Sequence, residues 1–287
     1  MNKSFQELDL SNAFLFGATA QDPEACRLIV KIATGRDVQT VSVHAEHSVL
    51  FSSDFRSVRL DVYGTDETDV NYNVEAQNRN EKNLPKRSRY HQAELDVSAL
   101  KPGEDFNNLK PSYIIFICTF DPFNQGLYRY TFEERCKECD MGLGDETCKI
   151  FLNTKGNNEK DVPKELVQFL KYMENSTDEF MREVTEKSVI ELHKKVTEVK
   201  KNRELEEGFM TGEELLRSSR AEGKAQGIVE GRAQGIVDAL ILLLNRMGTI
   251  SEDVNEKIHQ ETDLNVLMGW LELAAGVQSI EQFRDAI

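Results

Sequence analysis

Long apolar segments are missing from this sequence of 287 residues. A helix that crosses a membrane needs about 18–20 consecutive apolar residues. The best candidate, Ile236–Leu244, is far shorter and is interrupted by Asp238. The N-terminal residues MNKSFQELDLSNAF contain no apolar export core, so no signal peptide is expected. The sequence therefore predicts a cytosolic protein that does not enter a membrane.

Residues that mark several common site types are also scarce. The five cysteines form no regular framework, which fits a reducing compartment. Cys136 and Cys139 form a Cys-x-x-Cys motif followed by Cys148, but a structural zinc site needs four ligands and no fourth Cys or His lies nearby. The five histidines are scattered, and none pairs with a nucleophile. A Gly-rich phosphate loop followed by Lys and Ser or Thr is absent.

Positive charge is in deficit, with 35 Lys and Arg against 50 Asp and Glu and a formal net charge of −15. This balance argues against a nucleic-acid partner, because phosphate contacts need cations. The segment Asn78–Gln92 departs from it, with one acidic residue, Glu81, and five basic residues: Arg79, Lys82, Lys86, Arg87 and Arg89. Such a run beside two carboxylates suits a phosphodiester site. The alternative is an ordinary solvated loop and helix start.

The rest of the composition, 39% hydrophobic and 30% charged, is that of a globular protein. Patterning predicts helices at Asp22–Ala33 and from Pro85 to about Leu100, and a polar hairpin turn at Gly64–Asp69. Strands are expected at Thr40–His44, Val49–Ser52, Ser57–Tyr63, Asn71–Gln77, Ser112–Phe120, Leu127–Phe132 and Cys148–Leu152. The apolar run Ser112–Phe120 reads as a strand buried on both faces. This order predicts an α/β fold around one mixed sheet.

From about Val162 the sequence becomes helical, and Glu165–Glu207 is rich in Glu, Lys and Leu. We expect four parts: an α/β domain at 1–160, a long helical segment at 161–220, a Gly-repeat helix or hinge at 221–247, and a small helical bundle at 248–287. Helix starts with capping residues are predicted at Ser251, Asp263 and Ser279.

Glycines recur every four residues within the near-repeat GKAQGIVE and GRAQGIVD, at Gly223, Gly227, Gly231 and Gly235. This spacing places them on one face of a helix, where another helix can approach closely. Each glycine weakens a helix by about 1 kcal/mol relative to alanine. Two interpretations stay open: a face that pairs helices in a homodimer, or a flexible hinge between domains.

Two carboxylates interrupt strands that otherwise resemble core strands. Glu75 and Gln77 project from the same face of an extended strand, and a hairpin can bring Asp61 beside Glu75. Such acidic residues are expected to be solvated or bound to a cation. Asp61, Glu75, the backbone carbonyl of Ala76 and waters would suit Mg²⁺, which lowers the pKa of an attacking water. The alternative is a pair of solvent-facing carboxylates on a half-exposed hairpin.

Longer motifs surround these residues: VRLDVYGTDE (Val58–Glu67), YNVEAQ (Tyr72–Gln77), LPKRSRYHQAELD (Leu84–Asp96) and SYIIFICTFDPF (Ser112–Phe123). Together they closely resemble the bacterial recombination-promoting nuclease and putative transposase family of the PD-(D/E)XK superfamily. The segments Glu7–Glu24 and Lys149–Gly156 resemble it too, so the likeness spans about residues 7–160. The resemblance implies a restriction-endonuclease-like core at 1–160, with a mixed central sheet flanked by helices, followed by an all-helical C-terminal region.

The resemblance also implies roles for individual residues. Asp61 and Glu75 would bind Mg²⁺, with Mn²⁺ as a substitute, and Gln77 stands where the superfamily more often has Lys. A glutamine offers a neutral amide in place of a positive charge, so it would orient the attacking water or reduce activity. Three further candidates each have a structural alternative. Glu24 would be an additional metal ligand, or it is an ordinary surface residue. Tyr90 and Gln92 would contact the DNA backbone or the metal shell, or they are packed side chains.

Our main hypothesis from the sequence is a Mg²⁺-dependent DNA endonuclease, linked to recombination or mobile elements. Asp61, Glu75 and Gln77 would form its catalytic site, and Lys86, Arg87 and Arg89 would hold the DNA backbone. The alternative is a catalytically weak or inactive nuclease-fold protein that binds DNA or protein. That alternative is motivated by Gln77 and by the net acidity of the chain.

Overall fold

The computed structural model describes residues 3–44 and 62–287, which fall into two compact units, Met1–Phe209 and Met210–Ile287. The predicted strand Val49–Ser52 and the candidate ligand Asp61 lie outside the described residues. The first unit contains strands β1 (Val41–His44), β2 (Val62–Asp66), β3 (Asn71–Gln77), β4 (Ser112–Cys118), β5 (Arg129–Phe132) and β6 (Thr147–Asn153). Its helices are α1 (Ala13–Ala20), α2 (Pro23–Thr34), α3 (Leu84–Ala99), α4 (Lys164–Glu174), α5 (Asp178–Met181) and α6 (Lys187–Lys200), and α7 (Arg203–Met247) begins here.

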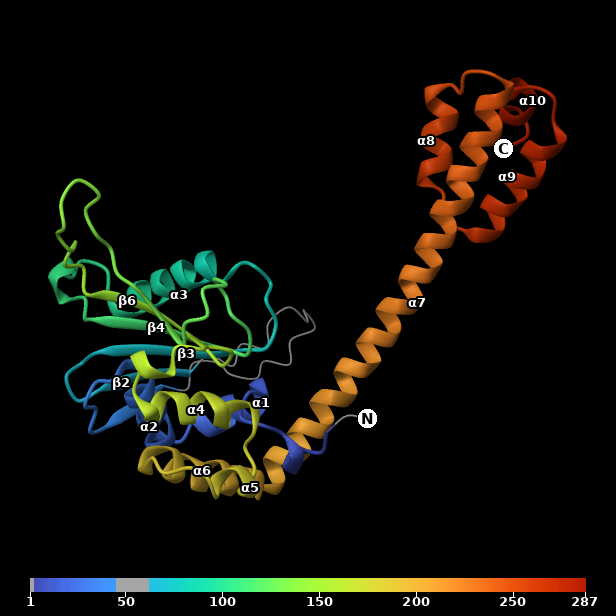
Figure 1. Ribbon diagram of the computed structural model, residues 1–287. Helices are drawn as coiled ribbons and strands as arrows, with labels where there is room; N and C mark the ends of the chain where they lie inside the picture. The colour runs from blue at the N-terminus through green and yellow to red at the C-terminus, as the bar shows by residue number, and fades with distance from the viewer. Residues whose placement is uncertain (1–2, 45–61) are drawn as a thin grey trace. The chain divides into compact units, whose positions relative to one another are not determined.

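The strands form one mixed sheet in the order β1-β2-β3-β4-β6-β5. β3 pairs with β4, and β4 with β6, in parallel, while the other neighbours are antiparallel. Helix α3 lies on one face of this sheet and α1, α2 and α4 lie on the other (Figure 1). The predicted α/β fold with a mixed central sheet flanked by helices is confirmed.

The central strand β4 is apolar on both faces, as its sequence predicts. Ile114, Phe116 and Cys118 pack in a cluster with Leu84 and Leu95 of α3. The alternating residues Ile115 and Ile117 belong to the larger core that α1, α2, α4 and α6 form on the opposite face. Because β4 is covered on both sides, no position in it can be polar without a buried partner.

Helix α2 has the ends that its sequence predicts. The Asp22 side chain accepts a hydrogen bond from the Ala25 N–H at 2.9 Å, with Pro23 at the first helical position. Gly35 ends the helix with φ of 75°, a left-handed conformation that favours glycine.

The prediction of a turn at Gly64–Asp69 is wrong at its start, because β2 continues to Asp66. Gly64 pairs with Val43 of β1, and a Cβ at Gly64 would lie 2.7 Å from Cγ1 of Val41. The glycine therefore serves close packing within the sheet and not chain reversal. The turn itself follows Asp66, whose backbone N–H donates to the Val70 carbonyl at 3.0 Å.

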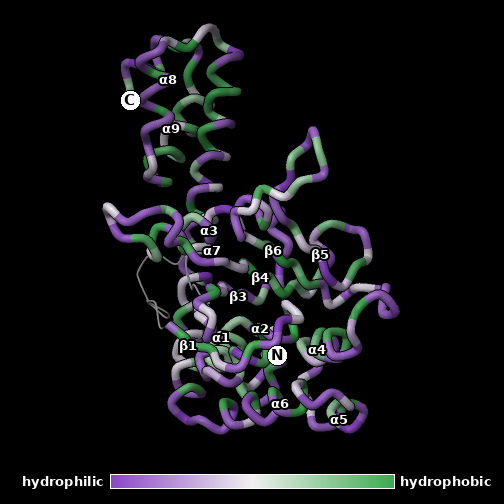
Figure 2. The backbone as a smooth tube through the Cα atoms, turned by 90° about the vertical axis from the view of Figure 1, so that its left-hand side faces the viewer, coloured by the Kyte–Doolittle hydropathy of each residue, from purple (hydrophilic) through white to green (hydrophobic). Residues whose placement is uncertain are grey.

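The second unit consists of the remainder of α7 with α8 (Glu252–Gln260), α9 (Leu264–Gly276) and α10 (Ile280–Arg284). Ser251, Asp263 and Ser279 are the N-cap residues of these three helices, as the sequence predicts. Helix α8 is mostly hydrophilic with a few hydrophobic residues (Figure 2), and α8 and α9 bury Val254, Ile258 and Leu267 against Leu240 and Leu244 of α7. Across residues 3–44 and 62–287, no helix is long and apolar enough to span a membrane.

Helix α7 continues without a break through the four repeated glycines. A Cβ at Gly223, Gly227, Gly231 or Gly235 would have no neighbour within 4 Å among the described residues. The glycine face therefore has no close neighbour among residues 3–44 and 62–287. Its pairing with a second copy, and the division of the chain into four parts, stay predictions.

Candidate functional site

A polar stripe runs along the face of β3 that lies under α3. Successive side chains of a strand alternate between faces, and Tyr72, Val74 and Ala76 of β3 belong to the large core on the opposite side. The alternate positions are all polar and point toward α3: Asn71, Asn73, Glu75 and Gln77. The stripe ends at Gln77, where the carboxyl ends of β3 and the parallel strand β4 lie side by side.

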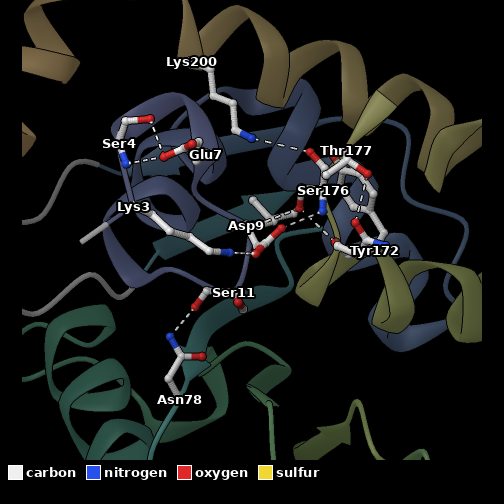
Figure 3. A network of polar contacts seen from close by, with 12 residues as sticks. Lys3, Ser4, Glu7, Asp9, Ser11, Asn78, Tyr172, Ser176, Thr177 and Lys200 are labelled. Atoms are coloured by element: carbon white, nitrogen blue, oxygen red, sulfur yellow. Dashed lines mark hydrogen bonds and ion pairs between the residues drawn. The ribbon is translucent and has the colours of Figure 1, made fainter. Parts of the chain in front are cut away.

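Contacts just beyond Gln77 fix the end of this stripe. The Gln77 carbonyl accepts a hydrogen bond from the Thr119 N–H at 3.0 Å. Asn78 then donates through its side chain to the Ser11 carbonyl (Figure 3). The segment around Ser11 is itself held to the end of α4, because Asp9 accepts from the Ser176 N–H at 3.0 Å. The carboxyl end of β3 is thus anchored to both a neighbouring strand and the N-terminal segment.

Glu75 is the centre of the polar contacts on this stripe. It is only 6% exposed, and its Oε1 forms an ion pair with Nη2 of Arg87 and accepts a hydrogen bond from Nε2 of Gln77. Arg87 Nη1 also donates to Oε1 of Gln77 at 3.3 Å. A buried carboxylate is stable only when it is paired and hydrogen-bonded. Arg87 and Gln77 supply that pairing on one of its two oxygens.

The second oxygen of Glu75 faces a residue that the sequence analysis missed. His91 Nε2 lies 3.5 Å from Glu75 Oε2, and His91 Nδ1 lies 3.4 Å from Glu94 Oε2. The imidazole side chain is 4% exposed, and its ring centroid lies 6.0 Å from that of Phe116. The available signal was helical spacing, since residues four apart in a helix share a face and His91 follows Arg87 by four.

Other predicted residues take different places. Tyr90 is exposed, whereas Gln92 is buried and donates to Ser112 Oγ at 2.7 Å and to Asp96 Oδ1 at 3.0 Å. Lys86 and Arg89 are exposed on α3. Gln92 therefore connects α3 to β4 rather than reaching Glu75.

The remaining candidate on the first helices, Glu24, lies in the first turn of α2. Its two oxygens accept from Nε and Nη2 of Arg27 at 2.8 and 2.6 Å. Burial opposes the effect, but the hydrogen bonds from Arg27 dominate and lower the pKa of Glu24. The described structure thus groups Glu75, Gln77 and Arg87, and it gives Glu24 a partner of its own on α2.

The donor atoms on the stripe suit a hard cation. Within the described residues, Asn73 Oδ1 is a buried acceptor oxygen without a hydrogen bond, and Glu75 Oε1 lies beside the partly exposed side chains of Gln77 and Arg87. Carboxylate and amide oxygens are ligands that Mg²⁺ and Mn²⁺ accept. No group of three or more His, Cys, Asp or Glu that could hold a metal occurs in the described part of the chain. A complete site therefore needs a ligand from elsewhere, and Asp61 lies outside that part.

Thiol chemistry is disfavoured at this site. Cys118 at the end of β4 is buried, and burial first, then the nearby carboxylates of Glu75 and Asp121, raise the pKa of its thiol to about 12. The reactive form of cysteine is the thiolate. At neutral pH Cys118 is therefore a protonated core residue and not a nucleophile.

Comparison with known proteins assigns a family to the larger part of the chain. A model of the PD-(D/E)XK nuclease family transposases matches residues 15–214, which is 200 of the 287 residues. No curated protein and no solved structure matches the chain significantly. The matched region contains the whole sheet and helix α3, and with them Glu75, Gln77 and Arg87. This chain belongs to the PD-(D/E)XK nuclease family transposases.

Proposed function

We propose that this protein is a DNA endonuclease that hydrolyses phosphodiester bonds with a divalent cation bound at Glu75. The observation that carries the proposal is the buried Glu75 carboxylate, which shares the end of β3 with Gln77 and faces the cationic Arg87. Glu75 provides a ligand for a cation, and Arg87 provides the compensating positive charge when the cation is absent. Membership of a nuclease family supports the same chemistry.

Asp61 is proposed as the second carboxylate of the site. Val62 of β2 pairs with Val74 of β3. Asp61 precedes Val62 and Glu75 follows Val74 in the sequence, so continued antiparallel pairing would set the two carboxylates opposite each other. The Gln77 carbonyl is bonded to β4 through Thr119, and alternation along the strand turns the Ala76 carbonyl toward the β2 side. We therefore propose Asp61, Glu75 and the Ala76 carbonyl as cation ligands.

The positions of Gln77 and Arg87 beside Glu75 suggest a role for each of them. A bound Mg²⁺ or Mn²⁺ would polarise the phosphodiester and lower the pKa of an attacking water. Gln77 supplies an amide beside Glu75 that orients the water or a phosphate oxygen. Arg87 is 30% exposed, so its guanidinium can contact a phosphate while it stays near Glu75.

The exposed basic residues next to the site would hold the DNA backbone. Lys86 and Arg89 lie on the solvent side of α3, and Arg79 and Lys82 are exposed in the segment that leads into it. A cluster of cations beside a catalytic carboxylate attracts phosphates locally even though the chain as a whole is acidic.

Plasmid cleavage tests this function. Full-length protein should nick or linearise plasmid DNA with Mg²⁺ or Mn²⁺ and lose that activity in EDTA. Asp61→Ala and Glu75→Ala should each abolish cleavage, whereas Glu133→Gln, an exposed carboxylate after β5, should not. Metal-dependent cutting that survives both alanine substitutions would exclude this site.

A second function is favoured by one observation. Gln77 replaces the positive charge of a lysine with an amide that is already bonded to Glu75 and Arg87. A protein with reduced or no catalysis could retain DNA binding through Lys86 and Arg89. Intact DNA binding with no cleavage under any metal condition would favour this binding module over the endonuclease.

Two broader proposals depend on the first. Cleavage of both DNA strands commonly needs two active sites, and the open glycine face of α7 would let two copies pair through their C-terminal helices. A nuclease of this kind would act in recombination or in the movement of mobile elements. We propose that it does so in the cytosol, where bacterial DNA lies.

A further inference from the structure

We propose that His91 is a positioning residue that fixes the Glu75 carboxylate for cation binding, and that Glu94 in turn orients the imidazole. The inference rests on the proposed function, because it concerns the affinity of the Glu75 site for a divalent cation. It adds His91 and Glu94, both from α3, to the groups already described around Glu75.

The two oxygens of Glu75 have different surroundings. Oε1 contacts Arg87 and Gln77, whose side chains are both partly exposed. Oε2 is buried, has no hydrogen bond among the described residues, and lies 3.5 Å from His91 Nε2. A cation that enters from solvent would thus meet Oε1, while His91 restrains Oε2. Because the two oxygens would have separate partners, the Glu75 carboxylate would not rotate, and Oε1 would point in a fixed direction toward the cation.

The imidazole ring is itself held from two further sides. Its Nδ1 lies 3.4 Å from Oε2 of Glu94, whose side chain is 35% exposed. Its ring packs against Phe116 of β4 with a centroid separation of 6.0 Å and an interplanar angle of 51°. The imidazole of His91 thus lies between two carboxylates. Its rotation is restricted, because each ring nitrogen faces a carboxylate oxygen and the ring packs against an aromatic side chain.

A purely structural histidine would have similar burial, so stability alone does not separate the two roles. A structural role predicts that replacing His91 lowers stability and leaves the cation affinity of the folded protein unchanged. A positioning role predicts weaker cation binding at a temperature where the variant is fully folded. Loss of a residue that orients a metal ligand typically weakens metal binding by about 10–100-fold.

The test is a calorimetric titration of full-length protein with MnCl₂, made with wild type, His91→Ala, His91→Gln and Ser88→Ala. Ser88 is a matched control, since it is 1% exposed on the same helix and its Oγ donates to the Pro85 carbonyl at 3.0 Å. Glutamine at 91 keeps an amide donor that can reach Glu75. Urea unfolding of each variant gives the stability, and circular dichroism confirms that each is folded during the titration.

We expect His91→Ala to bind Mn²⁺ at least about 10-fold more weakly than wild type. His91→Gln should recover part of that loss, and Ser88→Ala should bind as wild type does. Equal Mn²⁺ affinity in wild type and folded His91→Ala would overturn the positioning role while the proposed nuclease stands. If wild type neither binds Mn²⁺ nor cleaves DNA, both the inference and the proposed function fail.

Discussion

The Glu75 carboxylate on β3 and the Arg87 guanidinium on α3 form an ion pair in which 8% of the Glu75 side chain and 30% of the Arg87 side chain are exposed. Arg87 therefore neutralises Glu75 from the more open side of the site, where a cation would also approach. A divalent ion and Arg87 would compete for Glu75 Oε1. Such competition would link cation binding to stability and to the position of Arg87.

Replacing Arg87 with alanine tests whether Arg87 and a divalent cation compete for Glu75. Arg87→Ala leaves the buried Glu75 carboxylate without the guanidinium that neutralises it. This variant should have a free energy of unfolding about 1–3 kcal/mol lower than that of wild type. Mn²⁺ should stabilise this variant more than it stabilises wild type, because the ion no longer has to displace a guanidinium. Urea unfolding with and without Mn²⁺ measures both effects.

Arg89→Ala is the control for that experiment, since Arg89 lies two residues further along α3 and is exposed. Its stability and its response to Mn²⁺ should match those of wild type. An Arg87→Ala protein that Mn²⁺ stabilises no more than wild type would contradict competition at Glu75.

The exposed basic side of α3 should carry the salt dependence of DNA binding. Lys86→Ala and Arg89→Ala should each weaken binding and reduce the slope of log affinity against log salt by about 0.9, one phosphate contact each. Fluorescence anisotropy with labelled duplex DNA at several salt concentrations measures this slope. Lys164→Ala, an exposed lysine at the start of α4, should leave it unchanged. If the slopes of all three variants equal that of wild type, the DNA backbone does not contact Lys86 or Arg89.

Asp66, the last residue of β2, should make stability depend on pH. Burial raises the pKa of Asp66, but hydrogen bonds from Tyr72, Thr68 and the backbone N–H groups of Val70 and Thr68 outweigh it, so the pKa falls below its usual 3.8. The ionised form therefore stabilises the fold above pH 3.8, and this contribution is lost as the pH falls through the lower folded value.

The corresponding variant is Asp66→Asn, which cannot accept all of these hydrogen bonds. It should be less stable than wild type by about 1–3 kcal/mol near neutral pH. The difference should shrink below pH 3.8, as urea unfolding at a series of pH values would show. Asp69→Asn, on the exposed turn nearby, serves as the control. A difference that stays constant across this range would contradict the role of the ionised Asp66.

The sequence predicted the elements around the site well because their patterns are local. Asn71–Gln77 alternates polar and apolar residues and is a strand with those same ends, and Ser112–Cys118 is apolar on both faces as its composition indicates. Gly64 was misread because a glycine in a polar run usually marks a turn. Its actual cause, a close approach of Val41 from β1, depends on a neighbouring strand that the local sequence does not reveal.

The site itself was harder to predict, because its contacts join segments distant in sequence. Glu75 and Gln77 are two residues apart, and their shared face followed from strand geometry. Helical spacing places Arg87 and His91 on one face of α3, but the contacts of that face with Glu75 depend on how α3 packs across the sheet. The contact of Arg87 with DNA stays a prediction, to which the structure adds the ion pair with Glu75. The sequence analysis assigns no role to His91.

The glycine face of α7 offers a test that separates pairing from a hinge. Gly227→Ala with Gly231→Ala should stabilise the helix by about 1 kcal/mol per site, since each new Cβ meets nothing within 4 Å in the part of the chain that the structure describes. If the face pairs two copies, the same change should weaken the dimer. Light scattering on full-length protein and on a chain truncated after Asn202 measures the subunit number. Identical subunit numbers in all forms would contradict pairing through α7.

Cation binding at Glu75 can be observed directly in a crystal grown with Mn²⁺, from an anomalous difference map. We expect one peak bound by oxygens of both Asp61 and Glu75, at distances of about 2.0–2.3 Å, with Arg87 moved off Glu75 Oε1. Mn²⁺ bound away from Glu75, or an unbroken Glu75–Arg87 ion pair at saturating Mn²⁺, would contradict it.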